Sequence, residues 1–148
     1  MLVYKPGGLL TQAQPHIESL ELKMKRYIRE RDSKPGKVYL GVPHRLDRPV
    51  SGVMVLALHQ RAAKRISDQF QRRDVKKTYW TCVHGVELPE QGTCVDLMRM
   101  VPGEARSEIC DAAENGAKRA VLHYRVLQQR AEKTWLEIEL ETGRTHQI

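Results

Sequence analysis

Hydrophobic side chains recur at three- and four-residue intervals in two stretches of the chain, residues 17–31 and 60–73. This spacing is typical of an amphipathic helix. In the second stretch Ala63, Ile66 and Phe70 mark the face expected to be buried. Lysines and arginines fill many of the other positions, so we predict two helices that each carry a basic face. Plain solvation explains such a face more simply than a specific contact.

Other stretches have the composition and alternation of strands. Residues 136–140 alternate leucine and isoleucine with glutamate, which predicts a half-buried strand with one acidic face toward solvent. Residues 53–58 form an apolar run typical of a buried strand, and the irregular residues 93–119 predict a hairpin excursion. The remaining predicted strands are 2–4, 38–40, 77–83, a short one near 95–100, and 120–127.

Two helices and about six strands, joined mostly by hairpin-like connections, favour an α+β domain on a mixed, largely antiparallel β-sheet. The 148 residues suffice for one domain with a hydrophobic core, and 41% of them are hydrophobic. No apolar run approaches the roughly 18 residues of a membrane span, and the N-terminus lacks a signal-peptide pattern. We therefore expect a soluble, cytoplasmic protein that does not interact with membranes.

Charge and cysteine usage narrow the class of partner. Lysine and arginine number 25 against 18 aspartates and glutamates, a net charge of +7. This excess favours a polyanion, most simply nucleic acid, although many soluble proteins are as basic. Cys82, Cys94 and Cys110 are odd in number and widely spaced, which argues against a disulfide framework or a zinc site. No metal or organic cofactor is implied.

The chemically most suggestive stretch is His44–Gly52, which prolines at 43 and 49 keep from forming a helix. We predict an irregular loop that leads into the 53–58 strand. Asp47 stands between Arg45 and Arg48, and nearby positive charge favours an ionised carboxylate, which suits a nucleophile or a base. On composition alone the simpler interpretation is that the arginines are solvated and Asp47 caps a turn.

Four segments in order resemble the motifs of the RluA-type pseudouridine synthases, enzymes that isomerise uridine to pseudouridine within RNA. His44-Arg45-Leu46-Asp47, followed by Ser51-Gly52, resembles the family's catalytic motif, with Val50 where the family usually has threonine. The other three segments are Lys5-Pro6-Gly7-Gly8-Leu9-Leu10, Lys76-Lys77-Thr78-Tyr79 and Gly143-Arg144-Thr145-His146-Gln147-Ile148. The resemblance implies a bent mixed sheet with packed helices, and a single catalytic domain over residues 1–148.

The resemblance also implies roles for individual residues. It makes Asp47 the catalytic carboxylate, which either attacks the base or sugar or removes the 2′ proton of the sugar; both routes stay open. Arg45 fills the gap left by the flipped nucleotide. Tyr79 stacks on the uracil and takes its C5 proton, and Ile148 packs near the target base. Flipping costs a few kcal/mol, and stacking returns roughly 1–3 kcal/mol.

Lys77 and Arg144 complete the candidate substrate-binding residues. Each has a plainer alternative: Lys77 is a solvated strand end, Tyr79 an ordinary strand tyrosine, and Arg144 either shapes its loop or meets a phosphate. A structural role for His146 and Gln147 is at least as well supported. The expected partner is structured ribosomal or transfer RNA rather than DNA, and the family resemblance suggests a monomer.

In the family an arginine follows the last motif and pairs with the catalytic aspartate, whereas this chain stops at Ile148. We therefore expect the domain to be incomplete at its C-terminal end, and the short first strand suggests the same at the N-terminus. Two alternatives follow. One is a catalytically dead RNA-binding domain of the same fold. The other is a metal-dependent hydrolase that uses Asp47 and His44, for which the sequence offers no further clustered ligands.

Overall fold

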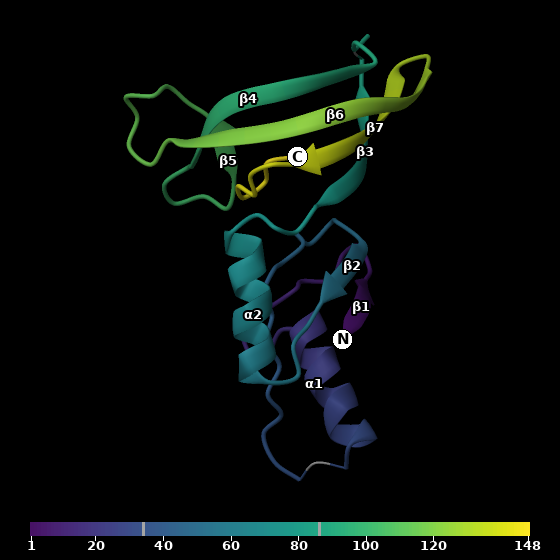
Figure 1. Ribbon diagram of the computed structural model, residues 1–148, viewed down its shortest axis with the longest axis vertical. Helices are drawn as coiled ribbons and strands as arrows, with labels where there is room; N and C mark the ends of the chain where they lie inside the picture. The colour runs from purple at the N-terminus through teal and green to yellow at the C-terminus, as the bar shows by residue number, and fades with distance from the viewer. Residues whose placement is uncertain (34, 86) are drawn as a thin grey trace. The chain divides into compact units, whose positions relative to one another are not determined.

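The computed structural model describes residues 1–33, 35–85 and 87–148. Contacts group the chain into two compact units, Met1–Asp74 (unit 1) and Val75–Ile148 (unit 2). The single domain over 1–148 stays a prediction, and the units are described one at a time. In chain order the elements are β1 (Leu2–Lys5), α1 (Leu20–Arg31), β2 (Gly52–Val55), α2 (Gln60–Gln71), β3 (Thr78–His84), β4 (Gln91–Met100), β5 (Ser107–Ile109), β6 (Lys118–Arg130) and β7 (Lys133–Leu140) (Figure 1).

Unit 1 contains both described helices, as the hydrophobic spacing predicted, but α1 begins later than expected. Ser19 has an extended backbone, and its hydroxyl accepts a hydrogen bond from the Leu22 amide at 3.3 Å. A serine in this position caps a helix and sets its first residue, so Ile17 lies outside. In α2 the predicted inner residues Ala63, Ile66 and Phe70 are half-buried, and the helix ends at Gln71 rather than at residue 73.

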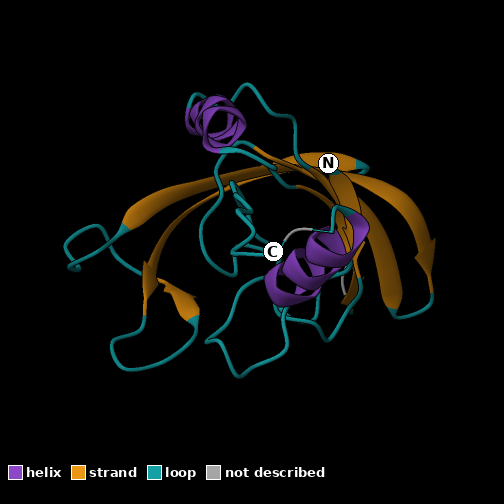
Figure 2. Cartoon of the chain, turned by 90° about the horizontal axis from the view of Figure 1, so that it is seen from below, coloured by secondary structure: helices purple, strands orange, loops and turns teal. Residues whose placement is uncertain are grey.

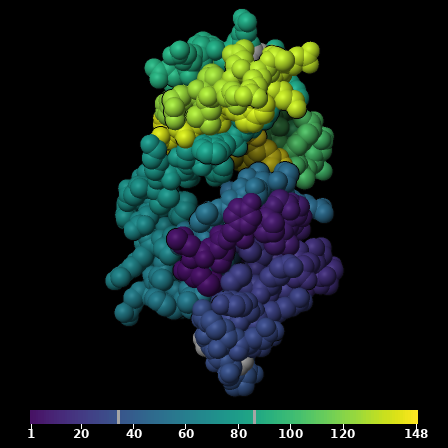
Figure 3. Space-filling model, turned by 90° about the vertical axis from the view of Figure 1, so that its right-hand side faces the viewer, coloured from purple at the N-terminus to yellow at the C-terminus, as the bar shows by residue number. Residues whose placement is uncertain are grey.

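The second strand of unit 1, β2, is shorter than its apolar run suggested, whereas β1 extends one residue beyond the predicted 2–4. β2 pairs antiparallel with β1 from Leu2 opposite Val55 to Lys5 opposite Gly52. The expectation of a strand buried throughout 53–58 is wrong, because Met54 is buried while Val53 is 65% exposed. The two-stranded sheet meets the core with one face only, so successive residues alternate between core and solvent. β1 is visible at the surface in Figure 3, at the purple end of the chain.

Residues 38–40, predicted as a strand, do not pair with any strand of the described sheets. Val38 and Leu40 are buried, and within the described residues 38–41 a bridge is made by Gly41 alone, with Ala57. These residues are apolar because they pack with Ile28 and Leu56 in the core of unit 1, not because they pair in a sheet. Burial and strand pairing leave the same short apolar signature in a sequence, so the pattern alone does not separate them.

Unit 2 is a five-stranded antiparallel sheet in the order β3-β7-β6-β4-β5. The α+β fold with a largely antiparallel sheet is therefore confirmed, and the long strands curve along their length (Figure 2). The pairing of β6 with β7 shifts register between Val126 and Gln128, and such a bulge bends a strand. The irregular 93–119 region supplies most of β4, all of β5 and the start of β6, so the hairpin excursion is confirmed.

On one face of this sheet the charged side chains form ion pairs with one another. Glu137 of β7 accepts hydrogen bonds from Arg125 at 2.9 Å and from the Trp80 indole at 3.2 Å. Both bonds lower the pKa of Glu137. Lys76 pairs with Glu139 at 2.7 Å. The predicted half-buried strand with an outer glutamate face is thus confirmed, with Leu136 and Ile138 buried on the other side, but cross-strand cations neutralise that face.

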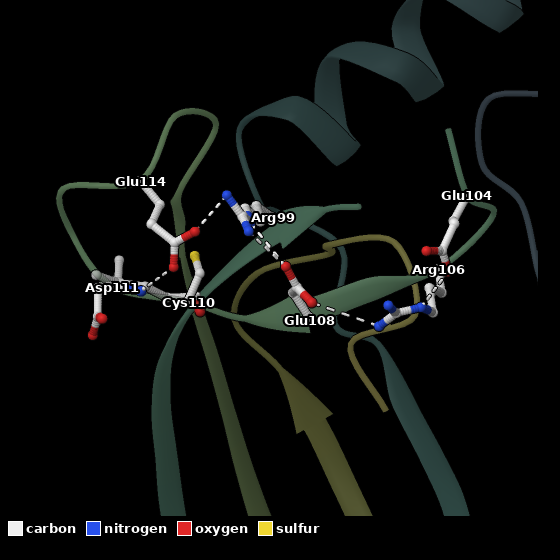
Figure 4. Close-up of polar contacts among 8 residues, drawn as sticks. Arg99, Glu104, Arg106, Glu108, Cys110, Asp111 and Glu114 are labelled. Atoms are coloured by element: carbon white, nitrogen blue, oxygen red, sulfur yellow. Dashed lines mark hydrogen bonds and ion pairs between the residues drawn. The ribbon is translucent and has the colours of Figure 1, made fainter. Parts of the chain in front are cut away.

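The β4–β5 hairpin carries further ion pairs between arginine and glutamate side chains (Figure 4). Arg99 contacts Glu108 at 2.8 Å and also pairs with Glu114. Arg106 pairs with Glu104 at 2.5 Å and reaches Glu108 at 3.6 Å.

Within the described residues, no helix of either unit is long and apolar enough to cross a membrane.

Candidate functional site

Asp47 lies in an irregular loop that leads directly into β2, as predicted from the flanking prolines. Its side chain is half-buried, and its carbonyl accepts a hydrogen bond from the Val50 amide at 3.1 Å, so the chain turns immediately after it. Arg45, two positions earlier, is exposed. A half-buried carboxylate on a loop can be reached by a substrate while its backbone stays fixed, provided that the loop is held in place.

The residue before Asp47 is held by a threonine from the N-terminal segment. The buried Thr11 hydroxyl donates a hydrogen bond to the Leu46 carbonyl at 2.6 Å and accepts one from the Leu46 amide at 3.2 Å. One side chain thus satisfies both backbone groups of Leu46, whose own side chain is also buried. Leaving such groups unpaired inside a protein costs about 1–3 kcal/mol each, so Thr11 fixes the backbone on this side of Asp47.

The residue after Asp47 is held by the Lys5–Leu10 segment. The Gly8 amide donates to the Arg48 carbonyl at 2.7 Å, and Arg48 Nε donates to the Gly8 carbonyl at 3.1 Å. Gly8 has a φ of 84°, and a Cβ on Gly7 would lie 3.0 Å from the Pro49 carbonyl oxygen, so this turn needs its two glycines. Two motifs that lie 40 residues apart in the sequence therefore form one structure, and Arg48 is not simply solvated.

Lys5 anchors the same turn from inside. It is 0% exposed, and its ammonium donates to the carbonyls of Leu9 at 2.7 Å, Pro6 at 3.1 Å and Arg48 at 3.4 Å. Burial lowers the pKa of Lys5, and the negative charge of Asp47 opposes that shift. The buried Lys5 ammonium and the candidate carboxylate of Asp47 therefore attract each other electrostatically.

His44 connects the loop to β2 and α2. Its Nε2 accepts a hydrogen bond from the Val55 amide at 2.9 Å, and its ring stacks on Phe70 with centroids 4.6 Å apart. Burial lowers the pKa of His44, which favours the neutral ring that this acceptor role requires. Because Nε2 accepts this bond, the neutral ring carries its proton on Nδ1, and neither nitrogen offers a free lone pair to a metal. Among the described residues no group of three or more His, Cys, Asp or Glu is placed to hold a metal ion.

In unit 2 the structure brings two further motifs together. Tyr79 of β3 lies opposite the buried Ile138 and is half-buried, on the sheet face opposite that of Trp80. The Lys77 carbonyl accepts a hydrogen bond from the Leu140 amide at 3.1 Å. A Cβ on Gly143 would lie 3.5 Å from the Lys77 ammonium. Lys77 is therefore a neighbour of the last motif and more than a solvated strand end.

The last motif, Gly143–Ile148, is organised by a glutamine. The Gln147 side-chain oxygen accepts from the Arg144 amide and the Thr142 hydroxyl, both at 2.9 Å, and its nitrogen donates to the Val121 carbonyl at 3.0 Å. Arg144 Nε donates to the Arg119 carbonyl at 2.9 Å. Gln147 and Arg144 therefore shape this loop, whereas Ile148 is 50% exposed.

Sequence reasoning assigned no role to Thr11 or Lys5. Nothing in the sequence marks Thr11, because a threonine after two leucines has no distinctive pattern. For Lys5 a signal existed: a cation directly follows the apolar residues 2–4 and precedes a proline–glycine turn. A lysine that ends an apolar strand is a candidate for burial with carbonyl partners.

Comparisons with known proteins agree with the four motifs. A sequence model of the family described as RNA pseudouridylate synthase matches residues 1–148. An uncharacterized RNA pseudouridine synthase of Zymomonas mobilis is 30% identical over 148 residues, which are 100% of this chain and 65% of that protein. Ribosomal large subunit pseudouridine synthase D of Xanthomonas campestris is 40% identical over 108 residues, 73% of this chain and 31% of that protein.

Among solved structures, human RNA pseudouridylate synthase domain containing 4 matches with a TM-score of 0.80 and 25% sequence identity, over 99% of this chain and 57% of that chain. The chain therefore belongs to the RNA pseudouridylate synthase family, and the resemblance inferred from its motifs is confirmed. It spans between about a third and two thirds of the length of the curated relatives it matches.

Proposed function

We propose that this chain provides the catalytic carboxylate of an RNA pseudouridine synthase, an isomerase that converts a uridine in structured RNA to pseudouridine. The reaction breaks the bond between N1 of uracil and C1′ of the sugar and forms a bond from C5 to C1′. The C5 proton leaves and N1 ends with a proton, so no redox partner or energy source is required. Asp47 is the proposed catalytic residue, as nucleophile or as base toward the 2′ proton.

The observation that carries this proposal is the way the Asp47 loop is fixed from both sides. Thr11 bonds both backbone groups of Leu46, and Gly8 and Lys5 bond the carbonyl of Arg48. A catalytic group has to be held within a fraction of an ångström of its working position, and buried hydrogen bonds to its neighbours do that. A carboxylate that merely capped a surface turn would not need such support.

The remaining roles come from the family resemblance and stay proposals. Arg45 fills the place of the flipped nucleotide, and Tyr79 stacks on the uracil and takes the C5 proton. Ile148 packs near the base. Lys77 and Arg144 are proposed as further substrate-binding residues, and the closeness of Lys77 to Gly143 and the bond from Arg144 to Arg119 support a position of both beside the last motif.

For the substrate we favour ribosomal RNA of the large subunit, because the Xanthomonas relative carries that substrate in its name. Transfer RNA is the second substrate to test. Structured RNA of either kind requires base flipping, and its cost is offset by contacts with the flipped base and with the surrounding RNA.

The test is release of tritium from RNA that carries uridine labelled at C5, since formation of the new bond expels that hydrogen. Asp47→Asn should abolish release while RNA affinity stays within about twofold, because the amide keeps the size of the carboxylate but cannot act as base or nucleophile. The matched control is Asp74→Asn, which removes an exposed carboxylate of the same unit that pairs with Arg72 at 2.9 Å. It should release tritium at the wild-type rate.

Loss of affinity and turnover in parallel for Asp47→Asn would count against a catalytic role. Tight RNA binding by the unaltered chain with no tritium release from either RNA would favour the alternative, a non-catalytic RNA-binding domain.

A further inference from the structure

The two helices of unit 1 are both basic, but their charges are compensated differently. Three of the five basic residues of α1 form ion pairs at nitrogen–oxygen distances of 2.6 to 3.2 Å: Lys25 with Glu21, Arg26 with Glu18, and Arg31 with Asp32. The other two, Lys23 and Arg29, lie six residues apart and so project about 120° from each other around the helix. α1 therefore presents no continuous surface of uncompensated cations.

On α2 the three basic residues Arg61, Lys64 and Arg65 are all exposed. They lie within an arc of about 100° on one side of the helix. None of them forms an ion pair with a carboxylate in the part of the chain that the structure describes, and this includes the half-buried Asp68 one turn further on. We call these three residues the α2 cationic face.

The opposite side of α2 is fixed to the segment that leads to Asp47. Phe70 stacks on His44 at 4.6 Å between ring centroids. At the other end, Ala63 lies so close to Gly41 that a Cβ on that glycine would be 2.6 Å from the Ala63 Cβ. Inward contacts at both ends hold the helix rigidly, so the α2 cationic face keeps a fixed position within the unit that carries the candidate carboxylate.

We propose that the α2 cationic face binds backbone phosphates of the RNA that surrounds the target uridine. This inference rests on the proposed function and adds a surface to it. Guanidinium groups bind phosphate oxygens through two parallel hydrogen bonds, and exposed cations without carboxylate partners do not have to break an ion pair first. Phosphate contacts position a nucleic acid without reading its sequence, which fits a helix next to the reactive loop rather than within it.

The experiment compares two triple variants that remove the same charge. One is Arg61→Gln, Lys64→Gln and Arg65→Gln on α2; the control is Lys25→Gln, Arg26→Gln and Arg31→Gln on α1. The probe is an unmodified in vitro transcript of large subunit ribosomal RNA with tritium at C5 of uridine. Dissociation constants are measured from low to moderate salt, and the single-turnover rate of tritium release is measured at saturating RNA.

For the α2 triple we expect about a tenfold weaker affinity at moderate salt, and a plot of log affinity against log salt that is shallower by about 2, since each lost phosphate contact removes about 0.7 to 0.9 from the slope. The rate at saturating RNA should stay at the wild-type value. The α1 triple should leave the slope nearly unchanged. The double variant Arg61→Lys and Arg65→Lys should keep the wild-type slope, because both positive charges are retained.

Equal loss of slope in both triples would overturn the inference, since it would mean that only net charge matters. An α2 triple with unchanged slope, in a protein that releases tritium, would overturn the inference and leave the proposed function intact. A wild-type chain that neither binds the transcript nor releases tritium would instead remove the proposed function. Far-ultraviolet circular dichroism of each variant confirms that the helices are folded.

Discussion

Unit 1 and unit 2 differ most in how they handle charge. Residues 1–74 contain 15 lysines and arginines against 7 aspartates and glutamates, a net charge of +8, whereas residues 75–148 contain 10 against 11, a net charge of −1. The charges of unit 2 are paired across neighbouring strands, as with Arg125 and Glu137 or Arg99 and Glu108. The basic character of the whole chain therefore comes from the unit that holds Asp47. A net charge computed over a chain hides such a division.

The two units nevertheless share one structural device. In unit 1 the buried Thr11 hydroxyl bonds the amide and the carbonyl of Leu46. In unit 2 the buried Thr142 hydroxyl accepts from the Val121 amide at 2.8 Å and lies 3.3 Å from the Val121 carbonyl. In each case a threonine fixes a distant segment next to a motif that the sequence had marked as functional. The two units therefore differ in charge but use the same kind of threonine–backbone hydrogen bond to hold their loops.

The stabilities of the two units can be measured separately by spectroscopy, because the helices and the tryptophans lie in different units. Both described helices lie in unit 1, and Trp80 and Trp135, the two tryptophans of the chain, lie in unit 2. Circular dichroism at 222 nm therefore follows unit 1, and tryptophan fluorescence follows unit 2. Coincident urea transitions would mean that the units unfold together, and separate ones that each has its own stability.

The largest effect is expected for Lys5→Met. The substitution keeps the length of the side chain but leaves the carbonyls of Pro6 and Leu9 without the ammonium that bonds them, whereas the Arg48 carbonyl keeps its bond from the Gly8 amide. We expect a loss of about 3 kcal/mol in the free energy of unfolding, because acceptors that lose their partner cost about 1–3 kcal/mol each. The urea midpoint at 222 nm measures it.

The matched control for Lys5→Met is Lys76→Met in unit 2, which removes a lysine with an exposed ion pair to Glu139. It should leave the fluorescence transition unchanged within error, since surface ion pairs contribute little. If Lys5→Met left the urea midpoint at 222 nm at the wild-type value, the buried ammonium would not be what holds the turn.

A smaller effect is expected for Thr11→Val, which has nearly the shape of threonine but lacks its hydroxyl. The Leu46 amide and carbonyl lose their partner, at a total cost of about 2 kcal/mol in the free energy of unfolding, the low end of about 1–3 kcal/mol for each group. Tritium release should slow at saturating RNA while RNA affinity is retained, and Thr11→Ser, which keeps the hydroxyl, should recover most of the rate. Thr142→Val should lower the fluorescence midpoint by a similar amount. Equal rates for the Val and Ser variants of Thr11 would contradict a positioning role.

The smallest effect concerns pH and His44. Burial lowers the pKa of His44 in the folded protein, whereas an unfolded histidine titrates near 6.5. As the pH falls, the unfolded chain therefore binds this proton first. Stability is lost from about pH 7 downward, and the loss levels off below the folded-state pKa. His44→Phe cannot accept from Val55 and is less stable at neutral pH, but it escapes this titration.

We therefore expect the stability gap between wild type and His44→Phe to narrow between about pH 7.5 and 5, as measured from urea midpoints at 222 nm. His16→Phe, an exchange of an exposed histidine in the same unit, is the control and should follow the wild-type curve. A gap that stays constant with pH would contradict a depressed pKa for His44.

Local pattern was enough to predict much of this protein. The two helices follow from three- and four-residue spacing, and the alternation in 136–140 correctly predicted that Leu136 and Ile138 of β7 are buried. The four motifs identified the family because their chemistry is carried by short contiguous strings. These features depend on residues close together in the sequence, where periodicity and composition act directly.

The tertiary structure alone decided how the candidate loop is held and which charges are compensated. Thr11 meets Leu46 across 35 residues, and Lys5 meets Arg48 across 43. No local pattern records such pairings, because a hydrogen bond depends on where the folded backbone places two distant groups. For the same reason the sequence showed only that both helices are basic, and the fold showed that α1 pairs most of its cations while α2 leaves Arg61, Lys64 and Arg65 without carboxylate partners among the described residues.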